Sequence, residues 1–301
     1  MNVRKLFVIG LALISTAANA PAWDNEGHET VVLVAFGINP ALKPRVEAIL
    51  KSLSSSSRWK SLKSTGLKPN NPFETQKSNP TAWVKALATQ PEKGAEFPDW
   101  ARDYRGYVTN KYDKIHYYNM DYDDPANTRF VDIPNAFTAL EPFEKDLKKR
   151  GKGARAWALT WIFHIVGDLH QPLHCVARGL PTNPNKSDNG GNGVEYHNQK
   201  LHAFWDHLPD KPSSHGVDLY ANALLLKLNQ MTPQQRSAFN AKASDLNPEH
   251  WIREGRDLIF DAGYPADNKV ADYDANAHKI ADNQILLAGA RLAKILERDL
   301  P

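Results

Sequence analysis

The chain has 301 residues and a formal net charge of +3, which is close to neutral for this length. Such an even balance gives no electrostatic footprint for binding nucleic acid through basic residues alone. Cys175 is the single cysteine, so a disulfide within the chain is excluded.

Residues 1–22 have the pattern of a signal peptide: a short positive start, an apolar run too brief to cross a bilayer, and then small residues. The cleavage site can be read before Pro21 or before Trp23. We favour Trp23, because proline directly after the cut makes a poor peptidase substrate. No later apolar stretch is long enough for a membrane helix, so we expect an exported domain of residues 23–301, periplasmic or secreted, without a membrane anchor.

Helical signals dominate the rest of the chain. The clearest helix lies in "ARAWALTWIFHIVGDLHQPLH", where Trp161, Ile165 and Leu169 recur at helical spacing and Pro172 ends the run. No Pro/Gly linker divides the chain, so we expect a single mainly α domain with at most a short hairpin near residues 190–196. Further helices are expected at 28–36, 44–53, 80–88, 135–149, 217–228, 233–242, 248–260 and 282–298.

Histidine and aspartate recur with helical spacing in the middle of the chain. His164 and Asp168 stand four residues apart, so both side chains project from one face of the clearest helix. His174 follows beyond the helix-ending proline, and His202 and Asp206 repeat the four-residue spacing on a second expected helix. These five residues could enter one cavity from several directions and bind metal.

Imidazole and carboxylate ligands without thiolates suit zinc in a hydrolytic site, although such sets also bind manganese or iron. A single His-x-x-x-Asp pair is more often a hydrogen bond or ion pair on a helix surface. His164 and Asp168, however, lie within an otherwise apolar stretch, where an unpaired carboxylate would be costly. The joint pattern therefore favours metal ligation.

Several longer blocks make the chain recognisable: "HIVGDLHQPLH", "GGN", "LHAFWD", "NPEHWIREG" and "AGARLAKIL". With these blocks in this order, the chain resembles the zinc-dependent single-strand nuclease family typified by the fungal S-one and P-one nucleases. The resemblance runs from Trp23 to near the C-terminus. It implies a multi-helix domain of the type shared with zinc-dependent phospholipase C.

The resemblance also implies three zinc ions. Asp99, His116 and His164 would hold one, Trp23 and His28 a second, and Asp168 would bridge these two. The third zinc would lie on His174, His202 and Asp206. Asp99 lies somewhat further from His116 than is usual in the family, so Asp103 is an alternative ligand. Of the implied ligands, Asp168 and Asp99 are the candidate catalytic residues, because the bridged pair activates hydroxide.

Trp23 would bind metal only as the first residue of the mature chain. A free α-amine and the carbonyl of the same residue can form a five-membered chelate, and an amine pKa near ~8 lets a dication keep the nitrogen neutral.

The implied activity is that of a zinc-dependent endonuclease. It would cut single-stranded DNA and RNA to 5′-phosphorylated products and would also dephosphorylate 3′-nucleotides. Tyr117 and Asn119 match positions at which family members contact a base. A zinc-dependent phospholipase C and a non-catalytic zinc-binding exported protein are the alternatives. No protein partner is inferred.

Overall fold

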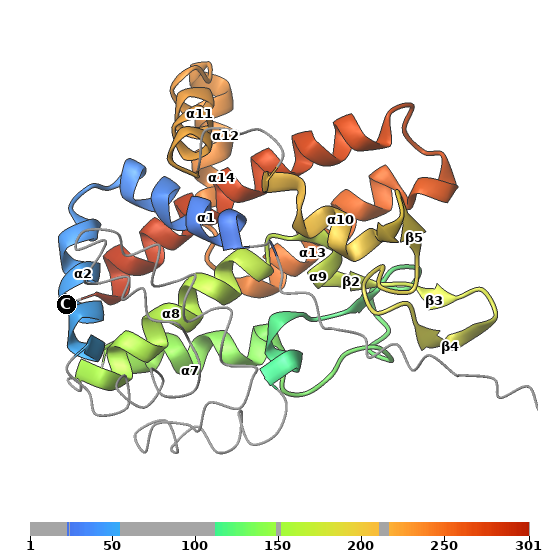
Figure 1. The fold of residues 1–301 in the computed structure, drawn as a ribbon, viewed down its shortest axis with the longest axis horizontal. Coiled ribbons are helices and arrows are strands. Elements are labelled where there is room, and N and C mark those ends of the chain that lie inside the picture. Colours follow the sequence, from blue (N-terminus) through green and yellow to red (C-terminus); the bar gives the residue numbers. More distant parts are fainter. Residues whose placement is uncertain (1–22, 24, 55–111, 149–151, 211–216, 301) are drawn as a thin grey trace, which may run out of the picture.

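The computed structural model describes residues 23, 25–54, 112–148, 152–210 and 217–300. Helices dominate this part of the chain, which confirms the prediction of a mainly α protein (Figure 1). The α-helices are α1 (Asn25–Ile38), α2 (Leu42–Ser54), α7 (Ala136–Lys148), α8 (Lys152–Asp168), α9 (Pro172–Cys175), α10 (Leu201–Asp206), α11 (Val217–Asn229), α12 (Pro233–Ser244), α13 (Pro248–Ala262) and α14 (Tyr273–Asp299). Short 3-10 turns are η2 (Tyr112–His116), η3 (Leu208–Asp210) and η4 (Pro265–Asp267).

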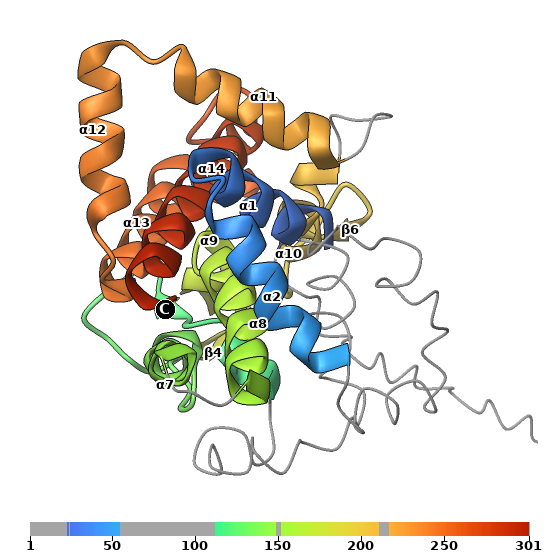
Figure 2. The same ribbon diagram turned by 90° about the vertical axis from the view of Figure 1, so that its left-hand side faces the viewer.

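Helix α8 lies at the centre of the described structure, in contact with α7, α2, α1 and α14 (Figures 1 and 2). The apolar side chains of α8 that the structure describes are buried on every side, including Leu159, Phe163 and Val166. A helix that is apolar all round must be enclosed by other elements. The two polar residues that α8 carries near its end, His164 and Asp168, are therefore held in the interior.

Helix α14 is the longest described helix and packs against α1, α12 and α8. It begins nine residues before the expected start at 282, because Asp272 caps it by accepting a hydrogen bond from the backbone N–H of Ala275. Its first turns are polar, so apolar spacing did not reveal them. Figure 2 shows α11 along the top of the fold and α12 along its left-hand side.

The break after α8 differs from the expectation. Pro172 does not end the long helix, which already ends at Asp168; instead the proline occupies the first turn of α9. Proline is tolerated there because the first N–H groups of a helix have no partner inside it. Gln171 caps this turn, and His174 follows on it.

Within the described ranges, the strands form three short pairs. β1 (Met120–Asp121) and β2 (Val176–Ala177) are parallel, with Met120 opposite Val176. β5 (Glu195–Tyr196) and β6 (Gln199–Lys200) form a hairpin that overlaps the expected range of 190–196, and β3 (Gly179–Leu180) and β4 (Asn183–Ser187) form a second one that was not expected.

The other expected helices are confirmed within a few residues, except the one at 80–88, which lies outside the described residues. Among the described helices, none combines the length and the apolar character that crossing a membrane requires.

Candidate metal centre

Seven of the side chains predicted to bind metal lie in the interior, and none of them is more than 5% exposed. They come from separate elements: His28 from α1, His116 from the end of η2, His164 and Asp168 from α8, His174 from α9, and His202 and Asp206 from α10. They form two clusters.

The first cluster consists of His28, His116, His164 and Asp168. The two oxygens of the Asp168 carboxylate face different rings: Oδ1 lies 3.3 Å from Nε2 of His28, and Oδ2 lies 3.0 Å from Nδ1 of His116. His164 Nε2 is 3.2 Å from the same Oδ2 and 2.6 Å from His116 Nδ1. A carboxylate that divides its oxygens between two sets of nitrogen ligands can bridge two cations.

A glycine lets α1 and α8 approach closely enough to form this cluster. A Cβ atom at Gly167 would lie 2.5 Å from Nδ1 and 2.8 Å from Cε1 of His28. The His28 ring also stacks on the His164 ring, with centroids 4.2 Å apart. Any side chain at position 167 would therefore push His28 away from Asp168.

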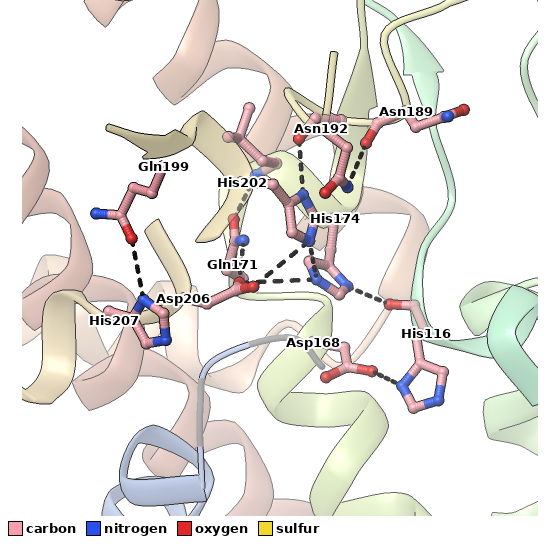
Figure 3. Close-up of polar contacts among 12 residues, drawn as sticks. His116, Asp168, Gln171, His174, Asn189, Asn192, Gln199, His202, Asp206 and His207 are labelled. Atoms are coloured by element: carbon pink, nitrogen blue, oxygen red, sulfur yellow. Dashed lines mark hydrogen bonds and ion pairs between the residues drawn. The ribbon is translucent and has the colours of Figure 1, made fainter. Parts of the chain in front are cut away.

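The second cluster consists of His174, His202 and Asp206 (Figure 3). His174 donates from Nδ1 to the carbonyl of His116 at 2.6 Å, and His202 donates from Nδ1 to the carbonyl of Gly190 at 2.7 Å. In the neutral rings, both Nε2 atoms then carry lone pairs, and these two atoms face each other at 3.0 Å. Two lone pairs at this separation repel unless a cation or proton lies between them.

The parallel pair of β1 and β2 joins the backbone that follows His116 to the backbone that follows His174. Beyond the β1 and β2 pairing, the N–H of Tyr118 donates to the carbonyl of His174 at 2.8 Å. The same backbone segment carries His116, whose carbonyl accepts the bond from the His174 ring. The backbone of one first-cluster ligand therefore holds the ring of a second-cluster ligand.

Burial keeps three of the cluster histidines neutral. It lowers the pKa of His164 to about 4, against the opposing effect of Asp168, and lowers the pKa of His174 to about 3. The pKa of His202 is lowered by burial as well. Neutral imidazole is the form that binds metal.

The two aspartates differ. Burial alone would raise the pKa of Asp168. The interaction with His164 and the hydrogen bond from His116 outweigh burial and keep this pKa well below its ordinary value, so the carboxylate is ionised. Burial raises the pKa of Asp206 well above its ordinary value, against the hydrogen bond from Gln171. A dication beside Asp206 would reverse that shift, because it favours the ionised form.

The donor set fits zinc. Among the described residues, Nδ1 of His28 and Oδ2 of Asp206 are buried atoms with no hydrogen-bond partner, which is costly unless another group binds them. The two clusters offer nitrogen and oxygen ligands. Cys175 does not join them, because burial raises the pKa of its thiol and its Sγ donates to the carbonyl of Leu169. Imidazole and carboxylate without thiolate are typical of hydrolytic zinc sites.

The structure locates some of the other predicted site residues. Trp23 is fully buried and packs on Gly27, where a Cβ atom would lie 2.6 Å from that of Trp23. Asp99 and Asp103 lie outside the described residues, so the choice between them stays a prediction. Tyr117 is partly buried beside Asp132, and Asn119 is buried with a left-handed φ of 60°.

Sequence reasoning did not identify Gly167 or Gln171 as site residues. Gly167 could be recognised only from the approach of α1, and Gln171 only from its contact with Asp206. Three further histidines lie near the ligands in the sequence. His170 is buried against Arg291, whereas His197 and His207 are exposed.

These features define a class: an α-helical protein whose interior presents two adjoining clusters of imidazole and carboxylate, the donor set of a multinuclear metal-dependent hydrolase. The comparisons identify the family within this class. The model of the S1/P1 nuclease family matches residues 23–300, and the chain belongs to that family. The family and the nuclease relatives support the prediction that the protein is a zinc-dependent endonuclease.

The relatives are distant. The chain is 24% identical to Endonuclease 2 of Arabidopsis thaliana, over 97% of this chain and 96% of the relative. It is 23% identical to Nuclease S1 of Aspergillus oryzae over 67% of this chain, and this match spans 59% of that relative. Endonuclease 1 of Arabidopsis thaliana is 22% identical, over 68% of this chain and 59% of the relative.

Proposed function

We propose that this chain is an exported phosphodiesterase that uses three zinc ions to hydrolyse single-stranded DNA and RNA. Its products would carry 5′-phosphates, and 3′-nucleotides would be dephosphorylated. The proposal rests on the Asp168 carboxylate, whose two oxygens face different histidines, and on the His/His/Asp cluster next to it, in a chain of the S1/P1 nuclease family.

The proposed zinc ligands follow the two clusters. Within the first, His116 and His164 would hold one zinc with Asp99, His28 would hold another with the amine and carbonyl of Trp23, and Asp168 would be shared by the pair. His174, His202 and Asp206 would hold the third. The near contacts of Asp168 with His28, His116 and His164 support this division.

Bound zinc supplies Lewis-acid chemistry, because it activates water as a nucleophile and withdraws negative charge from phosphoryl oxygens. The protein residues prepare for that chemistry. His164 and His174 are held neutral by burial, so their ring nitrogens are available without loss of a proton. The Asp168 carboxylate is ionised, and burial keeps bulk water from competing with the ligands.

Tyr117 and Asn119 are the proposed contacts for a substrate base. Tyr117 follows His116 directly in the chain and Asn119 lies three residues after it, so a base bound by them would lie next to the first cluster. Stacking of an unpaired base on an aromatic ring is worth about 1–3 kcal/mol and is lost when the base is paired and stacked in a duplex. This is the physical basis for the proposed single-strand preference.

The proposal is tested by assaying the mature protein, beginning at Trp23, with single-stranded DNA before and after removal of zinc by a chelator. We expect 5′-phosphorylated nucleotides in the first assay, none in the second, and recovery when zinc is restored. If verified zinc-loaded protein leaves single-stranded DNA and RNA intact, the nuclease proposal is wrong, and phospholipids become the substrates to test.

A further inference from the structure

Gln171 is a buried glutamine whose two polar ends are both bonded. Its side chain is fully enclosed in the turn between α8 and α9. Oε1 accepts a hydrogen bond from the backbone N–H of Leu173 at 2.5 Å, and Nε2 donates to Oδ1 of Asp206 at 2.8 Å (Figure 3). The amide therefore joins the first turn of α9 to a carboxylate of α10.

The bond from Gln171 makes the two oxygens of Asp206 unequal. Oδ1 is occupied by the amide, whereas Oδ2 is buried and has no hydrogen-bond partner among the described residues. Oδ2 lies 3.7 Å from Nε2 of His202, and the Nε2 atom of His174 lies 3.0 Å from that same nitrogen. The oxygen that Gln171 leaves unbonded is thus the one nearest the ring nitrogen of His202.

We infer that Gln171 is a positioning residue for the metal ion at the second cluster: it holds Oδ1 of Asp206 so that Oδ2 binds the ion. This inference rests on the proposed function. Through Leu173, the same amide caps the turn that carries His174, so one side chain orients two ligands of the site.

An amide suits this task better than a carboxylate. The Nε2 group of Gln171 donates at every physiological pH, whereas a glutamate at this position would place a second acceptor against Asp206. Hydrogen bonds of this kind to metal ligands are worth roughly 10–100-fold in metal affinity. Loss of the donor should therefore weaken one zinc site and leave the first cluster occupied.

The two bonds of Gln171 can be separated by substitution. Gln171→Glu keeps the length and the acceptor for Leu173 but removes the donor to Asp206. Gln171→Met removes both. A matched control is Gln284→Met on α14, which removes a buried amide that bonds to none of the ligands. Zinc per chain is measured after dialysis of each loaded protein against a weak chelator.

We expect the wild type and Gln284→Met to retain three zinc ions and both Gln171 variants to retain two. The site that is lost should bind zinc roughly 10–100-fold more weakly. The cobalt-substituted variants should lose the visible absorption bands of one site only. A general loss of stability would weaken the bands of all sites together. Circular dichroism checks that each variant is folded. If Gln171→Met does not fold, the result for Gln171→Glu decides the test.

Retention of three zinc ions by folded Gln171→Glu, with wild-type affinity at every site, would overturn the inference and leave Gln171 only its capping bond to Leu173. A wild-type protein that binds no zinc would overturn the proposed function instead. The two failures are therefore distinguishable in one set of measurements.

Discussion

Asp168 is the residue on which the first cluster depends. It is fully buried, it is ionised, and its two oxygens face rings from α1, η2 and α8. A neutral amide in its place would keep the shape but would offer one weak oxygen ligand instead of two charged ones.

We therefore expect Asp168→Asn to lower nuclease activity by more than about 100-fold and to reduce the zinc content of the first cluster. Activity on single-stranded DNA and zinc per chain are the two measurements. The matched control is Asp245→Asn, which removes the charge of an exposed carboxylate paired with His250 and should leave both values unchanged. An Asp168→Asn protein with full activity would contradict the proposed role.

Gly167 matters to the first cluster because it has no side chain. Because a Cβ atom there would lie 2.5 Å from Nδ1 of His28, we expect Gly167→Ala to displace that ring and weaken its zinc site about 10–100-fold. Gly37→Ala is the control: the three atoms nearest to its added carbon all belong to the Leu225 side chain on α11, and none belongs to a candidate ligand. Zinc titration of both variants tests the prediction, and equal affinities would show that α1 adjusts without cost.

At the scale of elements, a buried arginine joins three helices behind the centre. Arg291 of α14 is fully enclosed, and it donates to both oxygens of Glu254 on α13 at 2.8 and 3.0 Å. It also donates to Nε2 of His170 at 2.9 Å and to the carbonyl of Lys242 on α12. His170 is two residues from Asp168, so this network supports the turn between the clusters.

Removing Glu254 would leave the Arg291 cation buried without its carboxylate. We expect Glu254→Ala to lower the free energy of unfolding by about 3 kcal/mol. Glu249→Ala, which breaks an exposed pair with Arg253 on the same helix, should cost no more than about 0.5 kcal/mol. Urea unfolding of both variants at fixed zinc concentration gives the difference, and equal costs would refute it.

A second contact between elements should appear in the pH dependence of stability. Burial acts to raise the pKa of Asp267, but the N–H of Tyr264 and the Arg178 guanidinium, 2.9 Å away, outweigh it and lower the pKa. A lowered folded pKa means that the stabilisation is complete above the unfolded value of about 4 and is lost as the pH falls through the folded value.

The stability difference between the wild type and Asp267→Asn should therefore be largest near neutral pH and shrink steadily below about pH 4. Both proteins lose zinc in acid, so their difference isolates this carboxylate. Unfolding curves recorded across the pH range provide the measurement. A difference that stays constant into acid would show that Asp267 acts through shape and not through charge.

Local spacing predicted most helices and the His164/Asp168 and His202/Asp206 pairs, because residues four apart on a helix face the same way wherever that helix packs. It could not predict the Gly167 approach, the Gln171 bond or the Arg291 network, which join residues distant in sequence. Nor did it find the first turns of α14, where Asp272 rather than an apolar stripe sets the start.

At the scale of the whole molecule, the proposed function links export to catalysis. Trp23 is fully buried beside Gly27 at the start of α1, the helix that carries His28. Under the proposed function, its α-amine would become free only when residues 1–22 are removed. Processing would then complete the metal centre, and the uncut precursor would be inactive.

We predict that mature protein beginning at Trp23 binds three zinc ions, and that protein retaining Pro21 and Ala22 binds one fewer and loses about 100-fold or more in activity. Mass spectrometry verifies each N-terminus, and zinc analysis with a single-stranded DNA assay gives the result. Equal zinc content and activity in the two forms would remove the amine from the proposed ligand set.

We propose that the two clusters together form one multinuclear zinc centre. A crystal structure of the mature protein, with anomalous diffraction recorded at the zinc edge, would show this directly. We expect anomalous peaks at the His28/His116/His164/Asp168 cluster and at the His174/His202/Asp206 cluster. Zinc-loaded crystals with no peak at either cluster would rule out such a centre.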